Sequence, residues 1–137
     1  MNNSPKKENF PFHHNLHTRW KDMDAFGHIN HAIFITYIED SRISLFNRWD
    51  INNQNKSIIV ASLKIDYIKQ IYHPSKLVIG SKVSRIGGCS FDIESAIYMN
   101  NSTFAYAISL VTCVCYDYKI NQSIQVYDSI KKDYSNI

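Results

Sequence analysis

The chain is short of glycine and cysteine, and these shortages exclude several large classes of catalytic site. Only four glycines occur among 137 residues, and they form no GxGxxG motif, no phosphate-binding P-loop and no GxSxG nucleophile elbow. The three cysteines include no CxxC pair, and an odd count argues against a disulfide framework or a structural zinc site. What remains for chemistry is carboxylates, histidines and backbone groups.

Long apolar runs and a strong net charge are also missing. No segment approaches the ~18 consecutive apolar residues of a membrane span, and residues 1–8 are too polar for a signal peptide. A formal net charge of +3 is too small to indicate nucleic-acid binding. We therefore expect a cytoplasmic protein with no membrane or nucleic-acid partner. It should form one domain over residues 1–137, with flexible ends at 1–10 and 129–137.

One long apolar pattern dominates the first half of the chain. It runs from Asn30, a good helix-capping residue, to Trp49, with apolar residues every three or four positions. This spacing predicts a single helix, and its apolar character predicts that protein surrounds it. The expected core stripe consists of Ala32, Ile35, Ile38, Arg42, Leu45 and Trp49.

The second half alternates apolar and polar residues with a period of two. We expect strands at 58–68, 77–86, 91–99 and 104–118, joined by tight turns, and a short earlier strand at 16–20. Small side chains on one face of 104–118 would let the helix pack closely against it. Hairpin connections imply an antiparallel sheet, so the sequence predicts an α+β fold with one sheet around one helix.

Asp22 and Asp24 lie in a short loop immediately before the predicted helix. A carboxylate beside a helix N-terminus can act on a carbonyl group, because backbone N–H groups polarise the oxygen while the carboxylate attacks the carbon or activates a water. The other interpretation is a loop of turns and caps, in which Asp22 holds the loop by accepting hydrogen bonds from backbone N–H groups. The histidines at 13, 14 and 17 have no acidic partner at ligand spacing, so no metal site is predicted.

The stretch from Arg19 to His31 resembles the entry motif of hotdog-fold acyl-CoA thioesterases of the 4-hydroxybenzoyl-CoA thioesterase-like family. The resemblance continues at Tyr37–Arg42, Ile65–Lys69, Arg85–Ser90 and Val111–Cys115, in the family's order. It implies a hotdog fold, in which the sheet wraps the helix, and a homodimer or homotetramer with active sites between subunits. It also implies hydrolysis of an acyl-CoA to free acid and coenzyme A, with no cofactor beyond the coenzyme A of the substrate.

The same resemblance assigns roles to single residues. Asp24 is the catalytic carboxylate, as nucleophile or as general base, and the backbone N–H of His31, beside Asn30, polarises the thioester carbonyl. Gly27 allows a positive φ or a close approach of the ligand. The candidates for substrate binding are His28, Tyr37, Glu39, Lys69 and Arg85.

Several alternatives stay open. His28 can orient the loop, and Glu39 is either a second catalytic candidate or the ion-pair partner of Arg42. Lys69 and Arg85 can meet the phosphates of coenzyme A or be simply solvated. The substrate can be an acyl-carrier-protein thioester instead of an acyl-CoA, and a hotdog domain can also bind an acyl thioester without cleaving it.

Overall fold

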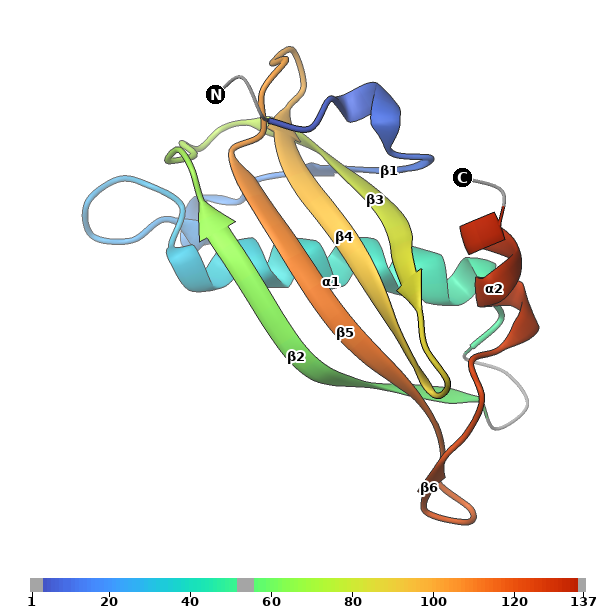
Figure 1. The fold of residues 1–137 in the computed structure, drawn as a ribbon. Coiled ribbons are helices and arrows are strands. Elements are labelled where there is room, and N and C mark those ends of the chain that lie inside the picture. Colours follow the sequence, from blue (N-terminus) through green and yellow to red (C-terminus); the bar gives the residue numbers. More distant parts are fainter. Residues whose placement is uncertain (1–3, 52–55, 136–137) are drawn as a thin grey trace.

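The computed structural model describes residues 4–51 and 56–135, which form a curled antiparallel sheet around one long helix (Figure 1). In chain order the elements are η1 (Lys7–Asn9), β1 (Phe12–His17), η2 (Trp20–Asp22), α1 (His31–Arg48), β2 (Ser57–Tyr67), β3 (Lys76–Ile86), β4 (Ser90–Met99), β5 (Ala107–Asp117), β6 (Gln122–Ser123) and α2 (Asp128–Ser135). Here η denotes a short 3₁₀ turn.

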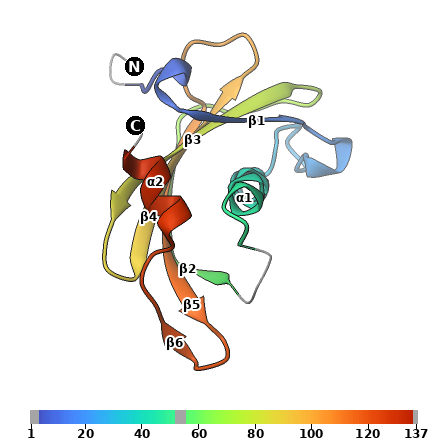
Figure 2. The same ribbon diagram turned by 90° about the vertical axis from the view of Figure 1, so that its right-hand side faces the viewer.

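The sheet has the strand order β1-β3-β4-β5-β2, with the short β6 added beside β5, and every pairing is antiparallel. Figure 2 looks along α1 and shows the sheet curving around it, with β1 and β3 on one side and β2 and β5 on the other. Register shifts at Val60/Ser62 and at Val83/Arg85 add local twist, which helps the sheet to curl. The predicted α+β hotdog architecture is confirmed.

Helix α1 forms where the sequence predicted it, between Asn30 as N-cap and Trp49 as C-cap. Its buried face differs from the expected stripe: Ala32 is exposed and Ile35 half-buried, whereas Phe34 and Tyr37 are buried. The face that carries both aromatic rings removes more apolar area from water, which explains this choice. The opposite face is exposed, so the described residues of one chain do not surround the helix on all sides. In the part of the chain that the structure describes, neither α-helix is long and apolar enough to cross a membrane.

Strand β5 presents its small side chains to α1, as expected. Ala107, Cys113 and Cys115 are fully buried in the core cluster that also holds Phe34 and Ile38 of α1. Burial raises the pKa of the Cys113 thiol to about 12, so this cysteine is a packing residue and not a thiolate nucleophile.

The first strand and the C-terminal segment depart from the expectations. β1 covers Phe12–His17 rather than 16–20, because this segment pairs residue by residue with β3 and η2 then turns the chain away. β5 begins at Ala107 rather than at 104. In place of the flexible tail expected at 129–137, α2 occupies Asp128–Ser135, with Ile130 fully buried. Phe10 is likewise buried within the segment 1–10 that was expected to be flexible; residues 1–3 and 136–137 lie outside the described residues.

Candidate functional site

The loop before α1 is closed at its base like a hairpin. The Asn30 N–H donates to the Asp22 carbonyl at 3.0 Å, and Met23 forms an isolated antiparallel bridge with Ile29. Ile29 is itself 1 % exposed, and its N–H donates to the carbonyl of Ile71 at 2.8 Å. The loop is therefore fixed both to the start of α1 and to the segment that follows β2.

Asp24 lies at the tip of this loop, and the loop backbone holds only one of its two carboxylate oxygens. Oδ1 accepts hydrogen bonds from the N–H of Phe26 at 2.8 Å and from the N–H of His28 at 3.4 Å. Among the described residues, none donates a hydrogen bond to Oδ2. The side chain is half-buried. One oxygen thus orients the carboxylate while the other stays available to a ligand.

Gly27 completes the tip with a φ of +85°, which confirms the predicted positive φ. A Cβ built at this position would meet nothing within 4 Å, so the backbone conformation and not a lack of space favours glycine. The Gly27 N–H donates to the Asp24 carbonyl at 3.2 Å, and the Asp24 N–H donates to the His28 carbonyl at 2.8 Å. These bonds fold the backbone tightly around Asp24.

The N-terminus of α1 leaves the backbone N–H of His31 without an acceptor among the described residues. The Asn30 side chain accepts from the Ala32 N–H at 2.8 Å, which confirms the predicted cap, and the Ile33 N–H donates to the Asn30 carbonyl at 2.9 Å. Within the described part of the chain the His31 N–H has no acceptor, and His31 is exposed. A free N–H at the positive end of a helix can donate a hydrogen bond to an oxyanion.

The ring of His31 is held against β2. It stacks on Tyr67 with the ring centroids 4.3 Å apart, and it meets Phe34 edge-on at 6.0 Å. The Tyr67 hydroxyl donates to the His31 carbonyl at 2.8 Å. Tyr67 therefore ties the end of β2 to the first turn of α1. Sequence reasoning quoted this tyrosine within a motif but gave it no role, because the contact spans 36 positions.

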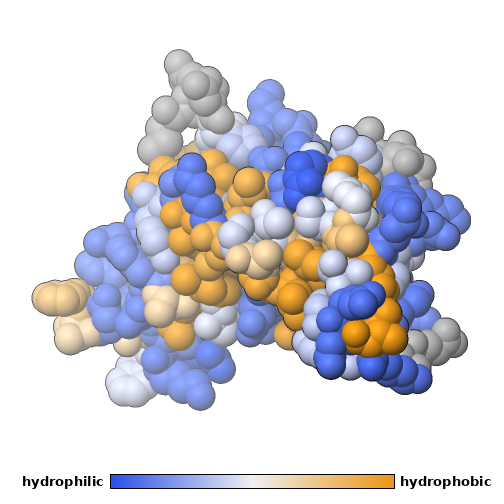
Figure 3. All heavy atoms as spheres, turned by 60° about the horizontal axis from the view of Figure 1, so that its bottom comes forward, coloured by the Kyte–Doolittle hydropathy of each residue, from blue (hydrophilic) through white to orange (hydrophobic). Residues whose placement is uncertain are grey.

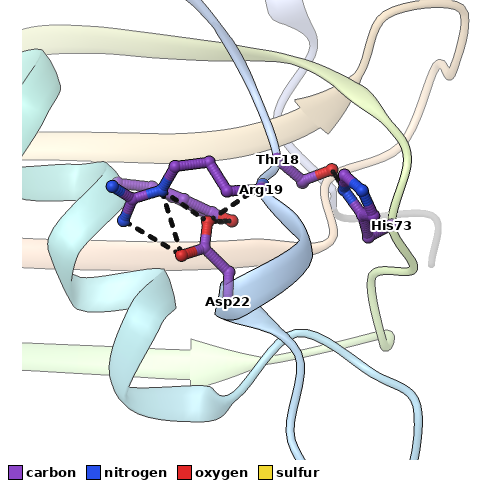
Figure 4. Close-up of polar contacts among 5 residues, drawn as sticks. Thr18, Arg19, Asp22 and His73 are labelled. Atoms are coloured by element: carbon purple, nitrogen blue, oxygen red, sulfur yellow. Dashed lines mark hydrogen bonds and ion pairs between the residues drawn. The ribbon is translucent and has the colours of Figure 1, made fainter.

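Asp22 is the buried counterpart of Asp24. Its carboxylate accepts hydrogen bonds from the Arg19 N–H at 3.1 Å and from the Arg19 guanidinium (Figure 4). It also accepts one from the Tyr37 hydroxyl at 2.6 Å. Burial on its own raises the pKa of Asp22, but these donors and the ion pair outweigh it and lower the pKa below the usual value. The expected structural role of Asp22, accepting a hydrogen bond from backbone, is confirmed.

Two residues that were candidates for substrate binding lie inside this framework. Tyr37 is buried, and burial together with the adjacent Asp22 raises the pKa of its hydroxyl, which therefore stays protonated as a donor. His28 is half-buried, with its ring 4.7 Å from that of Tyr72. Both positions suit residues that shape the loop.

Thr18 anchors the other side of the loop. Its hydroxyl lies 2.9 Å from Nδ1 of His73 and accepts a hydrogen bond from the Ser75 N–H at 2.9 Å (Figure 4). The Thr18 N–H donates to the Ser75 carbonyl at 3.0 Å. These contacts join the end of β1 to the connection between β2 and β3. No local signal in the sequence indicated them.

The structure does not bring the remaining candidates to the loop. Glu39 is exposed two turns along α1, and its carboxylate lies 3.9 Å from the Arg42 guanidinium. Arg85 lies near the C-terminal end of β3, and its Nε is 2.8 Å from a carboxylate oxygen of Asp92. Lys69 follows β2, and its ammonium lies over the ring of Phe104, 5.1 Å from the ring centroid. Across residues 4–51 and 56–135, no three His, Cys, Asp or Glu side chains form a group that could hold a metal ion.

Two curated relatives are similar to this chain in sequence. The chain is 33 % identical over 90 residues to the uncharacterized protein YsmA of Bacillus subtilis, a match that covers 64 % of this chain and spans only 61 % of YsmA. It is 21 % identical over 121 residues to the long-chain acyl-CoA thioesterase FadM of Escherichia coli, covering 85 % of this chain and 92 % of FadM.

Solved structures share the fold, and a family profile covers most of the chain. The PA5185 protein of Pseudomonas aeruginosa superposes with a TM-score of 0.88 at 20 % identity, covering 97 % of this chain and 95 % of that one. A thioesterase from Thermus thermophilus, complexed with coenzyme A and Zn, superposes with a TM-score of 0.78 at 24 % identity. The match covers 91 % of this chain and 98 % of that one. Residues 18–133 match the profile of the thioesterase-like superfamily. This chain therefore belongs to the thioesterase-like superfamily and has its hotdog fold.

Proposed function

We propose that the protein hydrolyses acyl-CoA thioesters to a free acid and coenzyme A. The observation that carries this proposal is that, among the described residues, the loop and the start of the helix that follows it leave two polar groups without a hydrogen-bond partner. These are Oδ2 of Asp24 and the N–H of His31 at the helix N-terminus. A carboxylate and a free helical N–H are what hydrolysis of a thioester requires. Coenzyme A in the Thermus structure and the acyl-CoA specificity named for FadM support the choice of substrate.

In the proposed reaction the thioester oxygen accepts a hydrogen bond from His31 N–H, which contributes ~3 kcal/mol as negative charge develops. By one route an Asp24 oxygen bonds to the acyl carbon, the C–S bond breaks and coenzyme A leaves as a thiolate that takes a proton from water. A second water then hydrolyses the mixed anhydride and restores the carboxylate. By the other route Asp24 takes a proton from a water that attacks the same carbon; the C–S bond then breaks, and the coenzyme A thiolate takes that proton, which restores the carboxylate. Gly27 and Asn30 position the carboxylate and the donor.

A second copy of the chain is part of the proposal, because β2 ends the sheet with an open edge. This eleven-residue strand pairs with β5 on one side, and no described strand pairs with its other side. Val60 is 48 % exposed and Leu63 36 % exposed, and Figure 3 shows apolar side chains gathered where the β2 side comes forward. A long, exposed apolar edge of this kind is normally covered. A symmetric dimer through β2 would cover it and add walls around the loop.

The decisive experiment compares wild type with Asp24→Asn on a panel of short, medium, long and aromatic acyl-CoAs, with free coenzyme A as the product measured. The asparagine Oδ1 can still accept from the Phe26 N–H, so the loop should stay folded. We expect kcat to fall by ~100-fold or more. Asp40→Asn, which changes an exposed carboxylate on α1, is the matched control and should leave kcat unchanged.

An unchanged kcat in Asp24→Asn would refute the role given to Asp24. If wild type cleaves none of the acyl-CoAs but cleaves acyl-carrier-protein thioesters, the substrate assignment is wrong and the chemistry stands. If it binds acyl-CoA without cleaving any thioester, the chain is a binding module. Size-exclusion chromatography with light scattering tests the dimer, which a monomeric mass would exclude.

A further inference from the structure

A second site candidate lies on the outer face of the sheet, away from α1. It is a cleft of about 760 Å³, within the usual range for small-molecule pockets. The N-terminal segment, the β4–β5 connection and Lys69, two residues after the end of β2, meet there, at the top of Figure 1. Its lining residues are Ser4, Lys6, Lys7, Glu8, Lys69, Thr103 and Phe104, and we call it the lysine cleft.

The N-terminal wall of the lysine cleft is fastened to the sheet. The Ser4 hydroxyl accepts a hydrogen bond from the Ala105 N–H at 3.0 Å, and the Lys7 ammonium donates to the Asn100 carbonyl at 3.1 Å. The Tyr98 hydroxyl donates to the carbonyl of Pro5. Residues 4–8 precede the segment 18–133 that matches the family profile.

The lining combines positive charge with an aromatic surface. Lys6, Lys7 and Lys69 contribute three ammonium groups, against the single carboxylate of Glu8. The Lys69 ammonium lies 5.1 Å from the ring centroid of Phe104, and that ring stacks on Tyr106 at 5.0 Å. Ammonium groups bind phosphates, and an aromatic face accepts a stacked base, so the chemistry of the cleft fits a phosphorylated nucleotide.

The lysine cleft also lies close to the loop of Asp24 along the chain. Tyr67 donates to the His31 carbonyl, and Lys69 is only two residues farther on, so the Cα atoms of Tyr67 and Lys69 are at most about 7 Å apart. A coenzyme A thioester carries a phosphorylated adenosine at one end of a long flexible arm and the thioester at the other. We propose that the lysine cleft binds this adenosine phosphate end, an inference that rests on the proposed function for the identity of the substrate.

The first test is binding of adenosine 3′,5′-bisphosphate to the whole protein, followed by calorimetry and independent of any turnover. We expect Lys69→Gln to raise the Kd by about tenfold, as expected when one charge-assisted contact is lost. The double variant Lys6→Gln/Lys7→Gln should raise it further, and added salt should weaken wild-type binding. The control is Lys119→Gln, an exposed lysine outside the cleft, which should leave the Kd unchanged.

Two results would overturn the proposal: a Kd that neither cleft variant changes, or inorganic phosphate binding as tightly as the bisphosphate, which would make the cleft a plain anion site. In the second test, Lys69→Gln should raise KM for an acyl-CoA with little change in kcat. The ratio of kcat/KM for acyl-CoA over the matching acyl-pantetheine, which lacks the nucleotide, should fall by about tenfold. An unchanged ratio counts against the cleft.

These tests separate the two proposals. If no thioester is cleaved but Lys69→Gln still weakens bisphosphate binding, the lysine cleft stands and the proposed reaction fails. If acyl-CoA is cleaved but bisphosphate binding does not depend on the lysines, the reaction stands and the cleft fails.

Discussion

The two ends of α1 differ in whether the polar groups there are paired. At the C-terminal end, Arg48 makes two hydrogen bonds to the carboxylate of Asp133 in α2, and the Trp49 indole N–H donates to the same carboxylate. At the N-terminal end, Asn30 caps one backbone donor, but no described residue pairs with the His31 N–H or with one oxygen of Asp24. A folded protein pairs the polar groups it needs for stability, so the end that keeps unpaired groups is the end suited to a ligand.

The same contrast recurs within the loop, between two carboxylates two residues apart. Asp22 is 1 % exposed and accepts hydrogen bonds from Arg19 and Tyr37 on both of its oxygens. Asp24 is half-buried and is held through one oxygen. Chemically identical side chains therefore serve stability in one case and are free for a substrate in the other. Substitutions at the two positions should separate stability from activity.

The largest stability effect should come from Asp22→Asn. The amide keeps the shape of the side chain but turns an NH2 group toward donors, so either the buried Tyr37 hydroxyl or the Arg19 groups lose an acceptor. We expect the free energy of unfolding to fall by about 3 kcal/mol, measured by urea denaturation at pH 7. The folded fraction should keep its kcat, the reverse of Asp24→Asn.

Asp40→Asn is the control, because that carboxylate is exposed, and its stability should stay within about 0.5 kcal/mol of wild type. Two results would contradict the division of roles between the two carboxylates: an Asp22→Asn variant as stable as this control, or a kcat for it that fell as far as that of Asp24→Asn.

Patterns that are local in the chain predicted much of this arrangement. The capping preference of Asn30 located the start of α1, because a cap acts on the next few residues. The positive φ of Gly27 and the structural role of Asp22 also follow from chemistry within a few residues. Alternation of period two placed β3 and β4 to within a residue or two.

The features that sequence reasoning missed depend on contacts between distant segments. The Tyr67 contact with His31 and the Thr18 contact with His73 join segments 36 and 55 positions apart. The polar composition of the tail suggested flexibility, but α2 is held by Asp133 at a distance of 85 positions from Arg48. Arg85 was a candidate for binding phosphate because it is basic, but its guanidinium is engaged by Asp92, a partner that only the hairpin register brings opposite.

Asp133→Asn tests the carboxylate that pairs with the C-terminal end of α1. The Arg48 guanidinium, and next the Trp49 N–H, hold the pKa of Asp133 below its usual value against the opposing effect of burial. A lowered folded pKa means that this stabilisation is complete above the unfolded pKa of ~3.9 and is lost as the pH falls through the folded pKa. We expect Asp133→Asn to lower the free energy of unfolding by about 2 kcal/mol at pH 7, with a difference that shrinks below pH ~4. A difference that stayed constant from pH 7 to pH 3 would show that the charge of Asp133 contributes nothing.

The smallest effect on stability is expected from a substitution at the N-terminal end of α1. Asn30→Ala removes the side-chain acceptor of the Ala32 N–H and should cost about 1 kcal/mol of stability. It should also lower kcat, by less than Asp24→Asn does, because a frayed first turn no longer holds the His31 N–H in place. Asn30→Ser keeps a capping oxygen and should restore most of both quantities. Equal losses in Asn30→Ala and Asn30→Ser would mean that the cap does not position the donor. Restoration by serine would show that a local capping bond, though small in energy, positions the His31 N–H for a substrate.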